Sequence, residues 1–150
     1  MRQKLSKRLL KQVMKTFNLT VPVKPVPASR PRVTRWGTYF TKTYTDFRND
    51  CYKFLSKISK KYPATDAAFI VHIDFICKRP KNPSNEYPVG DVDNYLKGPL
   101  DAITKIGMFW TDDTQIIKLS GTKRYQKSNE EFGMHITISE LSLEEASALL

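Results

Sequence analysis

The residues best suited to chemistry lie in the short stretch DVDNYLK, which begins at Asp91. Asp91 and Asp93 are two carboxylates separated by one residue, and Lys97 follows one helical turn after Asp93. A second acidic pair, Asp112 and Asp113, comes later in the chain. Carboxylates held close together repel unless protons or cations intervene, and Mg²⁺ prefers such hard oxygen ligands. We therefore expect a site for Mg²⁺, with Mn²⁺ as its substitute.

A cation held by these carboxylates would act on a phosphodiester. It can polarise the phosphate, lower the pKa of a bound water and stabilise the leaving oxygen. The ammonium of Lys97 would lie near the phosphate and oppose its developing negative charge. The simpler interpretation is structural: an aspartate that caps a helix, and an ion pair between Asp93 and Lys97. That interpretation explains one aspartate well and the whole DxDN set less well.

The positive charge of the chain is concentrated in its first third. The net charge is +10, and residues 1–45 contain 11 Lys and Arg but neither Asp nor Glu. The remaining residues carry 14 basic and 15 acidic side chains, so their net charge is −1. A basic block of this kind is typical of a protein that binds a polyanion, most simply nucleic acid. A solvated basic surface is the alternative.

Within this block, basic and aromatic residues alternate in the segment ASRPRVTRWGTYFTKT. Basic groups neutralise phosphates while aromatic faces stack on bases. The residues expected to contact DNA are Arg30, Arg32, Arg35, Trp36 and Lys42. The aromatic rings of Tyr39 and Phe40 are as well explained by packing on the core.

The fold is expected to be a single α+β (mixed α/β) domain, a mixed sheet with helices packed on it. Apolar spacing predicts a helix from about residue 45 to 62 and another from residue 92. Pro99 conflicts with an uninterrupted second helix, and Asp101 is expected at the surface. Period-two alternation predicts a strand over AAFIVHIDFICK. Residues 112–126 and 131–141 read as a hairpin of two strands, and a short helix is expected at the end.

The domain organisation follows from the same patterns. We expect a basic extension at 1–17, with a short basic helix at 3–16, then a domain at 18–142 and a tail at 143–150. Cys51 and Cys77 lie in apolar patterns without zinc spacing, which favours reduced core thiols in a cytoplasmic protein. No apolar run reaches membrane-spanning length, and no GxxxxGK loop indicates a nucleotide cofactor.

The segments DVDNYLKGPLDAITKIG and FWTDDTQII together resemble the RusA-type Holliday junction resolvases of bacteria and phages. The upstream segment KPVPASRPRVTRWGTYFT is also similar to the basic loop of that family. The resemblance in the order of the segments covers residues 18–140, and the motifs that are specific to the family lie between residues 91 and 117. It implies a Mg²⁺-dependent homodimer that makes paired nicks in four-way DNA junctions, in the cytoplasm of a bacterium or phage-infected cell and associated with the nucleoid.

By the same resemblance, Asp91 and Asp93 are metal ligands, Asp113 is the third carboxylate and Lys97 is the catalytic lysine. The GMFWT segment is one residue longer than the family pattern, and the alignment from Asp113 to Gln115 favours Asp113 over Asp112. Two other functions remain open: a basic nucleic-acid-binding module without catalysis, and a metal-dependent nuclease for forks or flaps. The basic residues 1–17 have no counterpart in the family pattern.

Overall fold

Strand β4 (Ala68–Cys77) lies in the middle of the hydrophobic core. The computed structural model describes residues 15–149. Phe69, Val71 and Ile73 face the helices and are completely buried, whereas His72 and Asp74 point to the opposite face of the sheet and are partly exposed. The alternation of period two thus correctly predicts this strand and its two faces.

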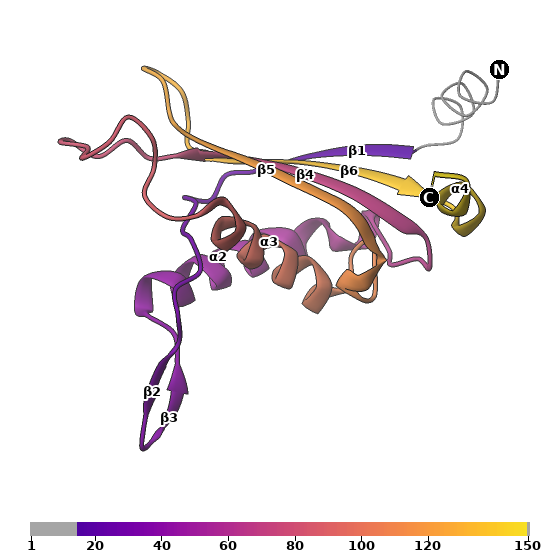
Figure 1. Ribbon diagram of the computed structural model, residues 1–150, viewed down its shortest axis with the longest axis horizontal. Helices are drawn as coiled ribbons and strands as arrows, with labels where there is room; N and C mark the ends of the chain where they lie inside the picture. The colour runs from indigo at the N-terminus through magenta and orange to yellow at the C-terminus, as the bar shows by residue number, and fades with distance from the viewer. Residues whose placement is uncertain (1–14, 150) are drawn as a thin grey trace.

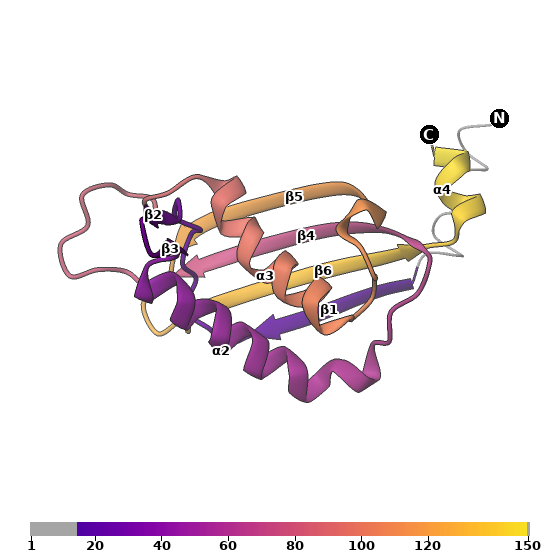
Figure 2. The same ribbon diagram turned by 90° about the horizontal axis from the view of Figure 1, so that it is seen from below.

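The sheet has four strands in the order β1-β6-β4-β5, and it is mixed (Figure 2). Strand β6 (Gly133–Leu141) runs antiparallel to both β1 (Lys15–Val21) and β4. Strand β5 (Ile116–Tyr125) pairs in parallel with β4 and forms one edge. The predicted fold class, one α+β domain with helices on a mixed sheet, is confirmed.

The expected hairpin of β5 and β6 is wrong, because β4 lies between these two strands. The helix between β4 and β5 returns the chain to the start of β4, and β5 is therefore parallel to β4. Most side chains of β5 are exposed and most of those of β6 are buried. A partly polar strand suits an edge, and an apolar strand suits the interior of the sheet.

Two helices, α2 (Lys42–Ile58) and α3 (Val92–Ile106), cover one face of the sheet (Figures 1 and 2). The Thr41 hydroxyl caps α2 by accepting a hydrogen bond from the Tyr44 amide. Both predicted helices are confirmed. Within residues 15–149, the remaining helical elements are short, and they are η1 (Ser59–Lys61), η2 (Asp113–Gln115) and α4 (Leu143–Leu149).

Helix α3 is uninterrupted even though Pro99 lies inside it. Inside a helix a proline lacks the N–H donor, and its ring crowds the carbonyl four residues earlier and the Cβ of the preceding residue; here the preceding residue is Gly98, which has no Cβ. Gly98 is also where α3 meets α2, since a Cβ there would lie 2.5 Å from Cε1 of Phe47. The same glycine therefore removes one of the clashes of the proline and permits the close approach of the two helices.

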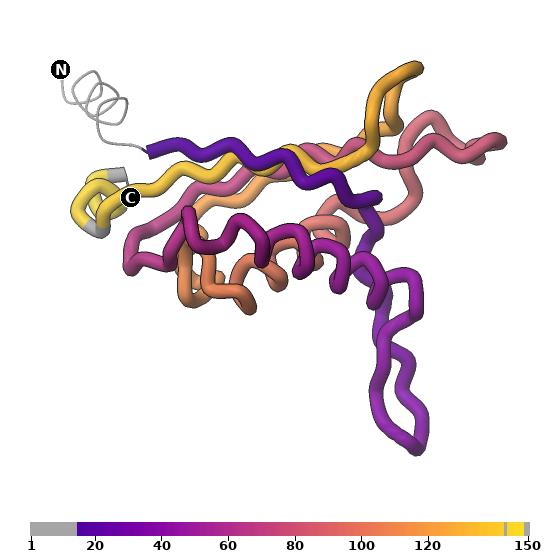
Figure 3. Tube along the Cα trace, turned by 180° about the vertical axis from the view of Figure 1, so that it is seen from behind, coloured from indigo at the N-terminus to yellow at the C-terminus, as the bar shows by residue number. Residues whose placement is uncertain are grey.

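A two-stranded hairpin, β2 (Arg32–Thr34) with β3 (Gly37–Tyr39), projects from the body on the helix side of the sheet (Figures 1 and 3).

The predicted helix at 3–16 lies almost wholly outside the described residues, and Lys15 to Phe17 begin β1 instead. Cys51 and Cys77 are free and buried, as expected. Within residues 15–149, no helix has the length and hydropathy to cross a membrane.

Candidate metal and DNA-binding site

Asp91 and Asp93 lie at the N-terminus of α3, where backbone N–H groups favour negative charge. Asp91 is the N-cap residue, and its main-chain oxygen accepts hydrogen bonds from the amides of Asn94 and Tyr95. Its carboxylate, however, does not cap the helix. In the part of the chain that is described, neither carboxylate forms an ion pair or a side-chain hydrogen bond. Both are exposed and have oxygens available for a ligand.

Several contacts hold the backbone that leads into Asp91. Gly90 has a φ of 101°, a left-handed conformation that glycine adopts easily, and a Cβ there would lie 2.9 Å from Pro27. The Tyr95 hydroxyl donates to the carbonyl of Val89 at 2.6 Å. The Lys123 ammonium donates to the carbonyls of Pro88, at 2.7 Å, and Gly90. These contacts fix the approach to the helix.

Lys123 is a residue that sequence reasoning missed. It comes from β5, 32 residues after Asp91 in the chain, and it reaches the loop before α3 from the sheet. Its ammonium also lies 5.5 Å from the centre of the Tyr87 ring. Its position in a basic strand carries no signal of this role, because the contact depends on how α3 and β5 pack.

Lys97 lies one turn beyond Asp93 and is exposed. Its ammonium donates to the side-chain oxygen of Asn94 at 3.2 Å. No ion pair between Lys97 and Asp93 is found among residues 15–149. An ion pair between Asp93 and Lys97 therefore does not orient these two side chains. The Lys97 ammonium remains at the surface, beside the end of the helix that carries Asp91 and Asp93.

Asp101 continues the line of Asp93 and Lys97 by another turn. Partial burial raises the pKa of its carboxyl and the nearby charge of Asp113 adds to this, while Arg48 and Lys97 lower it. Asp101 is exposed as expected, and its electrostatic proximity to Asp113 was missed. The regular spacing of residues 93, 97 and 101 is the signal that could have placed all three on one helix face.

The second acidic pair divides into two roles. The Asp112 carboxylate caps η2 by accepting from the Thr114 amide at 2.9 Å, and this hydrogen bond lowers its pKa. Gln115 completes the capping box and also donates to the carbonyls of Thr65 and Ala67. Asp113 is exposed and takes no part in the cap. Asp112 thus shapes the turn, and Asp113 presents its carboxylate at the surface.

One chain does not gather all three of the predicted metal ligands. Asp91 and Asp93 lie at the start of α3, while η2 follows the end of that helix and adjoins the start of β5 (Figure 2). Within residues 15–149, no group of three Asp, Glu, His or Cys side chains is arranged to hold a metal ion. Asp91 and Asp93 nevertheless suit Mg²⁺, which uses few carboxylates and fills its shell with waters or phosphate oxygens.

The residues predicted to bind DNA lie on and beside the projecting hairpin. Arg30, Arg32, Arg35, Trp36 and Lys42 are all exposed. The Trp36 side chain is 85% exposed, and the Arg35 guanidinium lies 5.2 Å from the centre of its ring. Phe40 is partly covered, because its ring packs 5.3 Å from Tyr44 and under the Arg48 guanidinium. The hairpin therefore presents positive charge and an uncovered aromatic face.

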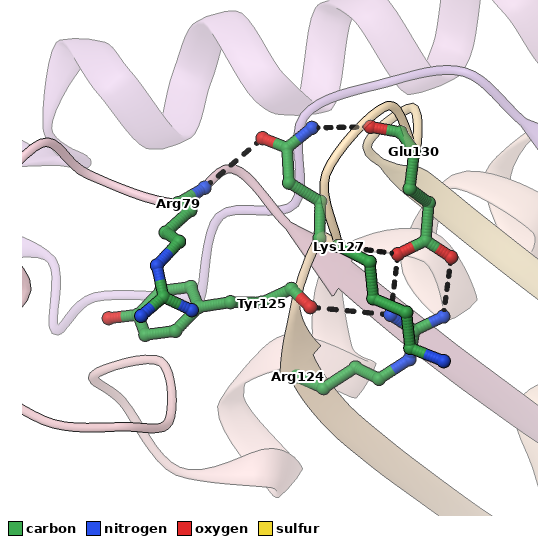
Figure 4. A network of polar contacts seen from close by, with 6 residues as sticks. Arg79, Arg124, Tyr125, Lys127 and Glu130 are labelled. Carbon is green, nitrogen blue, oxygen red and sulfur yellow. Dashed lines mark hydrogen bonds and ion pairs between the residues drawn. The ribbon is translucent and has the colours of Figure 1, made fainter.

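The loops 78–90 and 126–132 extend beyond the sheet at the end where α3 begins, and polar contacts brace them (Figure 4). Arg124 forms a bidentate pair with Glu130, at 2.6 and 2.7 Å. This pair lowers the pKa of Glu130 to about 2. The Arg79 amide donates to Gln126, whose own amide donates to the Glu130 carbonyl. The network connects both loops.

A comparison with protein-family models provides independent information on this chain. The model described as Endodeoxyribonuclease RusA matches residues 22–139. That range includes the hairpin, the start of α3, η2 and most of β6. A search of the curated proteins finds no match.

Proposed function

Because the chain belongs to the RusA endodeoxyribonuclease family, whose members resolve Holliday junctions, we propose that it cuts four-way DNA junctions by paired, Mg²⁺-dependent nicks. The chain is an endodeoxyribonuclease by its family. What we propose beyond this is that it uses Mg²⁺ and that it cuts in symmetric pairs. The observation that carries it is the pair of carboxylates Asp91 and Asp93 at the positive end of α3, neither of which forms an ion pair or a side-chain hydrogen bond with another described residue. Lys97 lies one turn along the same helix.

In this proposal, Asp91 and Asp93 hold the metal, whereas Asp113, the third carboxylate of the family pattern, lies beyond the other end of α3 and does not join them within one chain. A bound Mg²⁺ would supply an activated water and a Lewis acid for the scissile phosphate. The Lys97 ammonium, held beside the helix by Asn94, opposes the charge that develops on that phosphate. The N–H groups of the first turn of α3 add positive potential at the same place. Lys123 acts as a positioning residue for the backbone before Asp91.

The projecting hairpin supports binding to branched DNA. Its arginines can neutralise phosphates, and the exposed Trp36 ring can stack on a base that is unpaired at the branch point. A loss of stacking weakens binding by about 1–3 kcal/mol per base. The variant Trp36→Ala should therefore bind a four-way junction more weakly while its stability remains unchanged, as measured by fluorescence anisotropy and thermal melting.

A homodimer is part of the proposal, because a four-way junction has near two-fold symmetry and two identical sites can cut opposing strands. We also propose a cytoplasmic location, associated with the nucleoid of a bacterium or with phage DNA. A nuclease for forks or flaps would use the same carboxylates, and the choice of substrate distinguishes it. A binding module without catalysis would leave Asp91 and Asp93 unexplained.

The test is cleavage of a labelled synthetic four-way junction by the purified protein, with Mg²⁺ or with EDTA. Linear duplex and a Y-fork serve as competing substrates. Asp93→Asn removes one proposed ligand, and Glu131→Gln, at an exposed position of the loop before β6, removes a negative charge as the matched control. We expect symmetric, ligatable nicks that EDTA and Asp93→Asn abolish and Glu131→Gln preserves. Binding without cleavage would refute catalysis, and equal cutting of fork and junction would refute the specificity.

A further inference from the structure

We propose that a hollow at the base of the hairpin binds one nucleotide that is unpaired at the branch point of the DNA. The base would stack on Tyr39 and Phe40, and the phosphate would be held by Arg32 and Lys42. This inference rests on the proposed function and deepens it, because it assigns a site that recognises the branch point rather than the phosphate that is cut. The hollow is separate from Trp36, which lies in the turn between β2 and β3.

The hollow lies where the hairpin joins α2, and its volume is about 400 Å³. Pockets for small ligands measure about 300–1,000 Å³, so this volume lies in the range that suits a single nucleotide. The six residues that line the hollow are Arg32, Tyr39, Phe40, Thr41, Lys42 and Thr45. Two of them are cationic, two are aromatic and two carry hydroxyl groups. Side chains of these kinds contact the phosphate, the base and the sugar of nucleic acids.

The charge of the hollow favours an anion. Among the described residues, no Asp or Glu lines it. Within residues 15–149, neither Arg32 nor Lys42 forms an ion pair or a side-chain hydrogen bond, and both are exposed. A phosphate would therefore give two free cations a partner, in charge-assisted hydrogen bonds that are stronger than neutral ones.

The aromatic rings of the hollow are placed to accept a base. Tyr39 is 52% exposed, and it lies directly opposite Arg32 in the antiparallel ladder of β2 and β3. Residues directly opposite share one face of the ladder, with Cβ atoms about 5 Å apart. A base on the Tyr39 ring would therefore bring its own phosphate within reach of Arg32. The Phe40 ring is held in place beside the hollow by Tyr44 and the Arg48 guanidinium.

The hollow is tied to the N-terminus of α3 by the segment that leads into the hairpin. The Ala28 amide donates to the Asn94 carbonyl in the first turn of α3, at 2.8 Å. The four residues from Ala28 to Arg32 span at most about 14 Å, at about 3.5 Å per extended residue. The hairpin and the start of α3 accordingly lie at the same end of the sheet (Figure 2). Because successive phosphates of a duplex strand advance by about 3.4 Å, the hollow lies within a few nucleotides of the phosphate beside Asp91 and Asp93.

This arrangement distinguishes branched DNA from an unbranched duplex. In a duplex every base is paired and stacked, and the extrusion of a base is least costly where the base is already unpaired. A hollow that takes one extruded nucleotide therefore favours a branch point. Its fixed distance from α3 would also determine which phosphate near the branch point is cut.

The direct test is photocrosslinking of the purified protein, in EDTA, to four-way junctions that each carry one 5-iododeoxyuridine at a different position near the branch point. Photoexcited iodouracil couples to an aromatic side chain that it contacts, and mass spectrometry identifies that residue. We expect a crosslink to Tyr39 or Phe40 from one or two adjacent positions at the branch point, and none from an unbranched duplex of the same sequence. Crosslinks to Trp36 alone, no crosslink at all, or an equal crosslink to Tyr39 and Phe40 from the duplex would overturn the proposal.

Substitution of Tyr39 tests the contribution of the hollow to affinity, measured by fluorescence anisotropy. The loss of one stacked base corresponds to roughly a 5- to 150-fold loss of affinity. We expect Tyr39→Ala to lose this much affinity for the four-way junction and to keep its affinity for duplex, while Tyr39→Phe keeps both. Tyr52→Ala is the matched control, because Tyr52 is an exposed tyrosine of α2 outside the hollow. An equal loss of affinity for both DNAs in Tyr39→Ala, or no loss for either, would overturn the proposal.

Neither measurement requires cleavage, so the hollow and the proposed function can fail separately. If the junction is crosslinked through Tyr39 but is never cut with Mg²⁺, the proposed function is refuted and the hollow is kept. If the junction is cut in symmetric pairs and Tyr39→Ala binds it as tightly as the wild type does, the hollow is refuted and the proposed function is kept.

Discussion

The replacement of Lys123 by methionine tests whether the sheet positions the N-terminus of α3. The ammonium of Lys123 donates to two main-chain oxygens, those of Pro88 at 2.7 Å and Gly90. Hydrogen bonds to charged groups each contribute about 1.5–3 kcal/mol. Lys123 is half-buried, so water partly compensates for their loss. We expect the free energy of unfolding to fall by about 2 kcal/mol in total, roughly a 30-fold change in the unfolding equilibrium.

The measurement has a global and a local part. Urea denaturation gives the change in stability, and hydrogen exchange reports the amides of Asn94 and Tyr95, which donate to the Asp91 carbonyl. These amides should exchange faster in Lys123→Met, and Mn²⁺ affinity should decrease with them. Lys118→Met is the control, because Lys118 is an exposed residue of the same strand. Equal stability of the two variants, with unchanged exchange at Asn94 and Tyr95, would refute the positioning role.

Three further predictions concern packing and titration. Gly98→Ala should destabilise the fold by about 1–2 kcal/mol in urea denaturation, because overpacking against Phe47 exceeds the gain in helix propensity, and Phe47→Leu should relieve part of that loss. Burial raises the pKa of Cys51 to about 12, so its thiol should react with Ellman's reagent at pH 8 only on unfolding, and rapid reaction in the native protein would contradict this. Arg124 lowers the pKa of Glu130 to about 2, and an NMR titration should show this value in the wild type and a higher one in Arg124→Gln. The ion pair therefore stabilises the loops above pH 4.5, and this stabilisation is lost as the pH falls toward 2.

Local periodicity was enough to predict the helices and the central strand. The buried faces of α2 and β4 come from apolar residues that repeat at the helix or strand period, and such a repeat is visible without knowing what covers it. Pro99 could not be judged from its own identity. The helix continues through it, and the glycine before it has no Cβ to clash with the proline ring and also lets α2 approach closely, which is a matter of packing between elements.

Strand pairing and the details of the site could not be predicted in the same way. The pattern of β5 and β6 shows two strands, but their partners depend on the crossover through α3. The types of the candidate site residues were visible in the sequence, and their roles in catalysis and metal binding stay predictions. What the sequence could not show is that Lys123 reaches the loop before Asp91, since that contact joins elements brought together only by folding.

The pairing of β1 with β6 has a consequence for the synthesis of the protein. Thr16 and Ser139 are 123 residues apart in the chain and lie in hydrogen-bonding contact. Since β6 separates β1 from β4, β1 cannot join the sheet until β6 has been translated and has left the ribosome. Contacts of such sequence separation also slow folding. Until then the nascent chain keeps a strand that lacks its partner, and this interval is when chaperones would be needed most.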